Sequence, residues 1–148
     1  MAHHHLHSSP ATCHWGFFEA RLQPVLTVKS GDEVTIDTVS GGPEVVPDRS
    51  RFYVPPELAE IHASNERMVP GHILTGPIAV EGAEPGDVLG VDILDVKLRQ
   101  DGGYNLIKPL AGTLPDDFHE TRLLNIPLDR ERMVGRLPWG LDLPLKPF

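Results

Sequence analysis

The residue whose type and position best suit it to chemistry is His72, which lies in the stretch GHILTGP at residues 71–77. Glycine and proline at both ends of this stretch interrupt regular structure, so we expect a loop at the mouth of a strand, where functional side chains tend to lie. A neutral imidazole in such a loop can bind a divalent metal ion or a substrate. A simple hydrogen-bonded loop histidine is the alternative.

Three neighbours of His72 are further candidates. Thr75 and the backbone amides around Gly76 are expected on the same loop as His72, at the mouth of the strand. Glu81 follows an apolar run, and apolar surroundings raise the pKa of a carboxyl group towards the range of a general acid or base. The alternative for Glu81 is an exposed charge at the end of a strand.

Histidines also gather in the segment MAHHHLHSSP at residues 1–10. The segment resembles a purification tag, but Leu6 interrupts the run, which favours a native origin. Imidazoles at alternate positions could offer nitrogen atoms to a divalent metal ion. A flexible terminus that binds metal adventitiously is the alternative. Further ligands for a site at His72 could come from these histidines, His14 or Asp101, if the fold brings them near.

Short strands are the elements that must position these residues. Residues 25–28 and 33–39 are rich in β-branched side chains and flank a Ser-Gly-Asp turn. Residues 78–81 and 88–95 flank a Pro-Gly-Asp turn, and residues 88–95 alternate with the period of a strand. The similarity of the two turns suggests repeated hairpins. A short helix is expected at residues 55–62, where proline stands at the start.

Composition points to a β-rich fold. The 148 residues include 15 Pro and 14 Gly, which favours many turns over long helices. We therefore expect a mainly β fold that is sandwich-like or barrel-like, with short strands and at most short helices.

Charge and hydropathy exclude several classes of protein. The net charge is −8 and basic residues are scattered, so the electrostatic footprint of a nucleic-acid binder is missing. No apolar run approaches the roughly 20 residues that span a bilayer, and no signal-peptide pattern is present, which predicts no membrane partner and a cytoplasmic location. Cys13 is the single cysteine, so no internal disulfide can form. Nucleophile-elbow, Walker and dinucleotide motifs are absent.

Four segments together resemble the acetamidase/formamidase family. They are HWGF at residues 14–17, PVLTVKSGDEVTI at 24–36, HILTGPIAVEGAEPGDVL at 72–89 and LPWG at 137–140. The resemblance implies a β-rich, sandwich-like fold and hydrolysis of the C–N bond of small linear amides to a carboxylate and ammonia. It also implies a divalent metal cofactor, zinc in at least some members.

The resemblance assigns roles to the candidates by position. His72 would be the metal or substrate ligand, Glu81 the acid or base, and His14 a weaker candidate for a metal ligand. Thr75 would contact the substrate, and backbone amides near Gly76 would hold the oxyanion. The chain departs from the family pattern at residues 101–103, where Asp-Gly-Gly stands in place of Asp-Trp-Gly, and the loss of a large aromatic side chain is expected to open a pocket wall or weaken packing.

The resemblance covers the family's N-terminal half, since segments GGNMD and GDGH of the second half are absent. We therefore expect a flexible His-rich segment at residues 1–10 and a β domain at 11–148 that is the N-terminal portion of a longer protein. A truncated amidase is expected to form homo-oligomers or associate with the missing half. The alternative is a non-catalytic β module that binds a small molecule or a partner.

Overall fold

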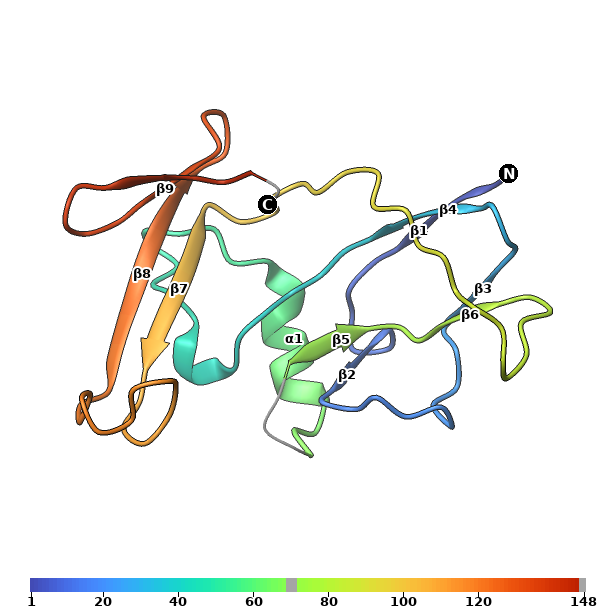
Figure 1. The fold of residues 1–148 in the computed structure, drawn as a ribbon, viewed down its shortest axis with the longest axis horizontal. Helices are drawn as coiled ribbons and strands as arrows, with labels where there is room; N and C mark the ends of the chain where they lie inside the picture. The colour runs from blue at the N-terminus through green and yellow to red at the C-terminus, as the bar shows by residue number, and fades with distance from the viewer. Residues whose placement is uncertain (69–71, 147–148) are drawn as a thin grey trace. The chain divides into compact units, whose positions relative to one another are not determined.

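The computed structural model describes residues 1–68 and 72–146 (Figure 1). The chain divides into two compact units. The first contains Met1–Pro43 and Pro55–Asp95, and the second contains Glu44–Val54 and Val96–Phe148. The His-rich segment at residues 1–10 belongs to the first unit, and the β domain expected at residues 11–148 extends over both.

Three two-stranded sheets make up the strands of the first unit. Strand β1 (His3–Leu6) pairs in parallel with β4 (Glu33–Ile36). Strand β2 (Cys13–Trp15) pairs antiparallel with β5 (Ile73–Thr75), and β3 (Leu26–Val28) pairs in parallel with β6 (Ile78–Val80). Each sheet joins segments far apart in sequence, so these short strands depend on long-range pairing.

The two Gly-Asp turns have the same internal hydrogen bonds. In the turn before β4, Asp32 N–H donates to the Lys29 carbonyl and the Asp32 carboxylate accepts from Lys29 N–H. In the turn after β6, Asp87 and Glu84 exchange the equivalent pair of bonds. The middle glycines have positive φ angles, 86° at Gly31 and 108° at Gly86, which residues with a side chain rarely adopt.

The prediction that each of these turns joins the two strands of a hairpin is wrong. Strand β3 pairs with β6 and β4 pairs with β1, so the two strands that flank the first turn do not pair with each other. A turn reverses or redirects the chain, but the neighbour of each strand is chosen by packing across the fold.

The short helix expected near residues 55–62 is present as α1 (Pro56–Ser64). Proline suits the first helical position because the missing N–H has no intrahelical partner there. Ile61 is fully buried, and its neighbour His62 stacks on the buried Trp15 of β2 with ring centroids 5.4 Å apart. Asn65, just after the helix, donates through Nδ2 to the carbonyls of Pro10 and Cys13. The helix and the residue after it thus hold β2 and the chain that leads into it.

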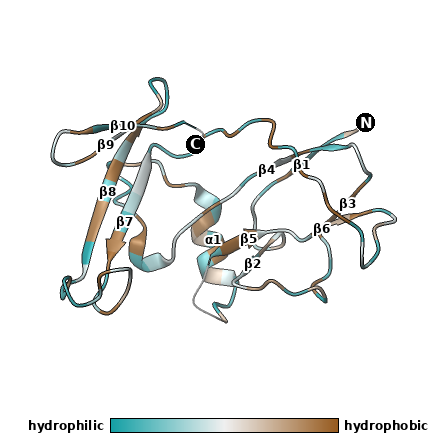
Figure 2. Ribbon diagram, in the orientation of Figure 1, coloured by the Kyte–Doolittle hydropathy of each residue, from teal (hydrophilic) through white to brown (hydrophobic). Residues whose placement is uncertain are grey.

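The second unit contains a four-stranded antiparallel sheet in the order β10-β9-β8-β7. Its strands are β7 (Gly102–Ile107), β8 (Arg122–Asp129), β9 (Val134–Arg136) and β10 (Asp142–Pro144). A 3-10 turn, η1 (Pro43–Val45), lies at the boundary in sequence between the two units. Figure 2 shows that β8, like β5 of the first unit, is coloured largely as hydrophobic.

Gly102 lies where the family pattern predicts tryptophan, and the ring of Phe52 occupies the space next to it. A Cβ atom built on Gly102 would lie 2.6 Å from Cδ1 of Phe52, which is closer than real Cβ contacts. Phe52 is itself buried. An aromatic ring from elsewhere in the unit therefore packs where the sequence pattern suggested a lost aromatic side chain.

The prediction of a strand at residues 88–95 is wrong. This segment is irregular, and its large apolar side chains are exposed, from 95% at Val88 to 67% at Val91. An alternating pattern shows that a segment can form a strand, but a strand also needs a neighbour for its backbone groups. No strand partner for this segment lies among the described residues.

The prediction of a mainly β fold with short strands and a short helix is confirmed. In the described parts of the chain, no helix combines the length and the apolar character needed to cross a membrane.

Candidate metal centre

Two histidines and an aspartate meet at one end of the β1–β4 sheet. The parallel register places His5 opposite Thr35 and Leu6 opposite Ile36, and the N–H of Asp37 continues the pairing by donating to the Leu6 carbonyl at 2.9 Å. His7 and Asp37 each follow directly after this pairing. Because the strands are parallel, their ends lie at the same edge of the sheet, so residues 30 apart in sequence become neighbours.

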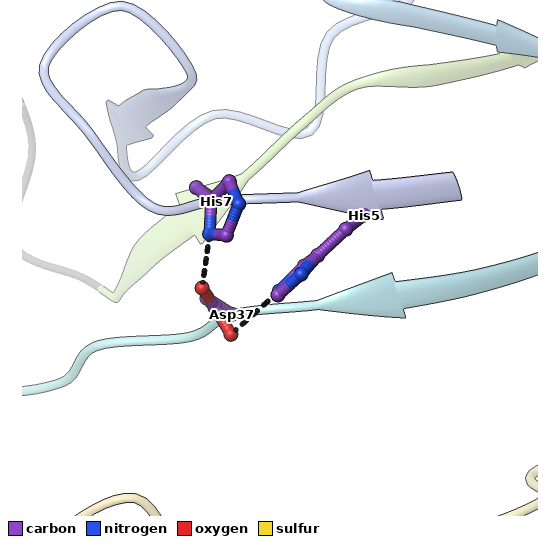
Figure 3. A group of neighbouring side chains, drawn as sticks. All are labelled: His5, His7 and Asp37. Atoms are coloured by element: carbon purple, nitrogen blue, oxygen red, sulfur yellow. Dashed lines mark hydrogen bonds and ion pairs between the residues drawn. The ribbon is translucent and has the colours of Figure 1, made fainter. Parts of the chain in front are cut away.

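The carboxylate of Asp37 lies between the two imidazoles (Figure 3). Nδ1 of His7 is 2.8 Å from one carboxylate oxygen and Nε2 of His5 is 3.1 Å from the other. The two imidazole centroids are 3.8 Å apart, with the planes tilted by 39°. Each oxygen of Asp37 is thus engaged by a different ring.

The cluster has one sheltered member and two accessible ones. The Asp37 side chain is 18% exposed, whereas those of His5 and His7 are 41% and 69% exposed. The carboxylate is therefore held inside the fold, and the imidazoles have room to rotate and to exchange protons with water.

The donor atoms suit a divalent ion such as zinc. Nδ1 or Nε2 of each histidine and a carboxylate oxygen of Asp37 all lie within 4.8 Å of one another. Zinc bonds to nitrogen and oxygen at about 2.0–2.2 Å, so donor atoms this close together could share one ion. Two imidazoles and one carboxylate are a donor set found in catalytic zinc sites. In the part of the chain that the structure describes, no other group of three such side chains comes this close.

The remaining histidines of β1 have separate partners. Nε2 of His3 lies 2.9 Å from the Thr35 hydroxyl, and Nε2 of His4 lies 3.3 Å from the Asp32 carboxylate. Hydrogen bonds from the N–H groups of Ala2 and Lys29, and then from His4, lower the pKa of Asp32 to about 2. All four histidines of residues 1–7 therefore contact the segment from Asp32 to Asp37. We predicted that residues 1–10 are flexible, but in the structure residues 3–6 form a paired strand.

The predicted metal ligands His72 and His14 do not join this cluster. His72 is exposed, just before β5, and its imidazole has no partner among the described residues; residues 69–71 of its expected loop lie outside them. His14 lies on β2 opposite Leu74, with its Nδ1 buried and without a partner among the described residues. Burial lowers the pKa of His14 from its ordinary value. His14 stacks loosely on Phe17, with centroids 6.5 Å apart.

Of the other predicted site residues, Glu81 and the backbone amide of Gly76 have partners outside the cluster, whereas Thr75 contacts it. Glu81 follows β6, its side chain is 63% exposed, and it lies 3.9 Å from the ammonium group of Lys29. The N–H of Gly76 donates to the Thr12 carbonyl at 2.9 Å, so this amide is already engaged. Thr75 is the predicted residue that reaches the cluster, because its hydroxyl donates to the backbone carbonyl of Asp37 at 2.9 Å.

Sequence reasoning identified the alternating histidines as possible ligands but missed Asp37. The spacing of His5 and His7 places both on one side of an extended chain, which is a local signal. Asp37 lies within an ordinary β-branched run at residues 33–39, and nothing in the local sequence distinguishes it from other aspartates. Its role depends on the pairing of β1 with β4.

Comparison with known proteins gives a consistent family match. The sequence profile of the Acetamidase/Formamidase family matches residues 4–126, a range that includes all three residues of the cluster. The chain is 36% identical over 106 residues to a formamidase from Methylophilus methylotrophus, covering 67% of this chain and 24% of that protein. It is 69% identical over 29 residues to an acetamidase from Mycolicibacterium smegmatis, covering 20% of this chain and 7% of that protein. The chain thus spans about a quarter of the formamidase, and no solved structure matches it significantly.

Proposed function

Because the chain belongs to the acetamidase/formamidase family, we propose that it contributes the metal centre of an amidohydrolase that cleaves the C–N bond of small linear amides. The observation that carries this proposal is the cluster of His5, His7 and Asp37, which is a donor set suited to zinc. When bound, a divalent ion would supply a Lewis acid for the carbonyl oxygen of the amide.

The charges of the cluster favour a divalent cation. Asp37 supplies one negative charge, and neutral imidazoles supply the two nitrogen donors. The carboxylate is the least exposed of the three groups, and its main chain is hydrogen-bonded on both sides, to Leu6 and to Thr75. Asp37 would therefore be the anchored ligand, and the two more exposed histidines would complete the donor set.

If Nδ1 of His7 is the ligand atom, metal binding requires a change of proton position on that ring. In this structure Nδ1–H of His7 donates a hydrogen bond to the Asp37 carboxylate. As a ligand the same nitrogen must be free of a proton, so the neutral ring then carries its proton on Nε2. The ring is 69% exposed, so this exchange can proceed through water.

The amide class of the substrate is supported by the family and by the names of the two relatives, a formamidase and an acetamidase. Formamide and acetamide are therefore the first substrates to test. Neither His72, His14 nor Glu81 joins the cluster in this structure, and we leave all three outside the proposed donor set.

The test is a calorimetric titration of the metal-free chain with zinc, paired with an assay of ammonia release from formamide and acetamide. His5→Ala and His7→Ala are each expected to weaken zinc binding at least tenfold. His4→Ala is the matched control, because His4 lies on the same strand and pairs with Asp32 instead. Zinc affinity unchanged in both His5→Ala and His7→Ala would overturn the proposed donor set.

The two assays separate the metal centre from the reaction. Zinc binding together with ammonia release that a chelator abolishes and zinc restores would support both. Zinc binding without ammonia release would support the alternative of a non-catalytic β module with a metal site.

A further inference from the structure

Thr75 joins two sheets of the first unit through its side chain. It is the last residue of β5, where it lies opposite Cys13 of β2. Its hydroxyl donates at 2.9 Å to the backbone carbonyl of Asp37, which follows β4 in a different sheet. The contact therefore links the β2–β5 sheet to the residue that anchors the metal cluster.

The direction of the hydrogen bonds around Thr75 is determined by its single hydroxyl proton. The Asp37 carbonyl can only accept, so the Thr75 proton is committed to it. The sulfur of Cys13 lies 3.5 Å from the Thr75 oxygen, and the thiol must therefore be the donor in that contact. Cys13 is 6% exposed, so water does not readily replace it. The buried thiol orients the hydroxyl, and the hydroxyl holds the carbonyl.

Both backbone groups of Asp37 are held as a result. Its N–H donates to the Leu6 carbonyl, and its carbonyl accepts from Thr75. Fixing the two peptide groups that flank a residue fixes the direction of its Cα–Cβ bond. These backbone contacts place the Asp37 side chain on the side where its carboxylate contacts His5 and His7.

The residue after Thr75 supports the other side of the cluster. The N–H of Gly76 donates to the Thr12 carbonyl, and the Thr12 hydroxyl donates to the backbone carbonyl of His7 at 2.6 Å. The pair Thr75–Gly76 thus reaches Asp37 directly and His7 through one intermediate residue. Both ligand-bearing segments are attached to the end of β5.

We propose that Thr75 is a positioning residue of the metal centre, which acts by holding the main chain of Asp37 in the orientation that a metal ion requires. This inference rests on the proposed function, because it presupposes that the cluster binds a metal ion. It assigns to Thr75 a role in supporting a ligand, in place of the contact with substrate that the sequence predicted.

The experiment compares three substitutions in the 148-residue chain. Thr75→Val removes the hydroxyl at nearly constant shape, Thr75→Ser keeps it, and Thr27→Val makes the same change as the first on an exposed residue of β3. Cobalt(II) is the probe, since its d–d absorption reports the geometry of the site as well as occupancy. Thr75→Val is expected to weaken cobalt binding about tenfold or more, as loss of outer-shell support does in metal sites, and to alter the d–d bands. Thr75→Ser and Thr27→Val should remain within about threefold of the unmodified chain.

A stability control separates positioning from a general structural role. Ile61→Val shortens a fully buried side chain of α1 and lowers the melting temperature without touching these hydrogen bonds. If Ile61→Val weakened cobalt binding as much as Thr75→Val does, the positioning role would be overturned. Should Thr75→Val fail to give a folded circular dichroism spectrum, Thr75→Ala deletes the same hydroxyl without placing a methyl group against Cys13, and the same loss is expected.

The remaining outcomes distinguish this inference from the proposal beneath it. In one outcome the unmodified chain binds cobalt, and Thr75→Val binds it equally well with the same spectrum. This result would overturn the positioning role but not the metal centre. Unmodified chain that binds no cobalt or zinc would overturn the metal centre and the positioning role together.

Discussion

The carboxylate of Asp37 accepts a hydrogen bond from Nδ1 of His7 at 2.8 Å, although the two residues are 30 positions apart in the sequence. The contact exists because β1 and β4 run in parallel and end together. It combines the most sheltered and the most exposed member of the proposed metal centre, so substitutions at the two residues should have different consequences.

Asp37→Asn should have a larger effect than either histidine substitution. It removes the negative charge of the one sheltered ligand, and it replaces one of the two acceptor oxygens that His5 and His7 contact with an NH2 group that cannot accept. We expect zinc affinity to fall more than tenfold and the metal-free chain to be destabilised by about 1–3 kcal/mol, the usual cost of losing hydrogen bonds to a charged group. Zinc calorimetry and urea unfolding measure the two effects. Glu84→Gln, in an exposed turn, is the control, and an Asp37→Asn chain with zinc affinity like that of this control would contradict the assignment.

Asp32 should make the fold sensitive to acid between about pH 4 and pH 2. Its pKa is lowered from 3.8 to about 2 by hydrogen bonds from Ala2 and Lys29 N–H groups and from His4. A lowered carboxyl pKa contributes stability that is present above 3.8 and is lost as the pH falls through the folded value near 2. The carboxyl ¹³C shift of Asp32 should therefore titrate with a midpoint near 2. A midpoint near 3.8 would show that these hydrogen bonds do not persist in solution.

His14 should oppose folding when it is protonated. Burial lowers its pKa below the ordinary value of 6.5, so the unfolded chain takes up this proton more readily than the folded one. Stability associated with neutral His14 is complete above 6.5 and is lost as the pH falls below that value. Unfolding of a His14→Gln variant in urea should accordingly depend less on pH between 7.5 and 5 than unfolding of the unmodified chain. A ring titration of His14 at or above pH 6.5 would show the prediction to be wrong.

Truncation of Ile61 tests whether α1 is central to the core of the first unit. The side chain is fully buried, so Ile61→Ala should cost about 2–5 kcal/mol through lost burial and the cavity left behind. Leu89→Ala is a matched control because Leu89 is 71% exposed, and it should change stability by less than about 0.5 kcal/mol. Equal losses of unfolding free energy for the two variants would be incompatible with this description of the core.

Replacing Gly102 with alanine should destabilise the protein. The Cβ of Gly102→Ala would lie 2.6 Å from the ring of the buried Phe52, so the ring or the strand must shift, at a cost of about 1–3 kcal/mol. At the neighbouring Gly103 the equivalent Cβ would lie 4.0 Å from Leu128, an ordinary contact, so Gly103→Ala should be nearly neutral. Urea unfolding of both variants checks the difference. A Gly102→Ala chain as stable as Gly103→Ala would mean that Phe52 does not occupy this position in solution.

Local chemistry made several elements predictable. The turns at residues 29–32 and 84–87 follow from glycine at positive φ and from aspartate, whose carboxylate bonds back to the main chain. The start of α1 follows from Pro56, which fits the first helical position and no later one. In each case the residues that determine the conformation are within four positions of one another.

Strand pairing was not predictable in the same way. Residues 88–95 have a clear strand pattern but no strand partner in the described structure, whereas residues 3–6 are mostly histidine and form a paired strand. Alternation of apolar and polar residues shows only which side chains would share a face if the segment were a strand. Whether the segment becomes a strand depends on hydrogen-bond partners that the segment itself does not contain.

For the proposed metal centre, some residues could be identified from the sequence and others only from the structure. The sequence by itself determined that His5 and His7 share one side of an extended chain and that the protein belongs to a family of amidases. Only the tertiary structure selected Asp37 as their partner and attached it to Thr75, because both contacts cross between strands that no local pattern assigns to each other. A ligand set assembled by long-range strand pairing is determined by the tertiary fold, because the energy that brings the strands together comes from packing of the whole unit.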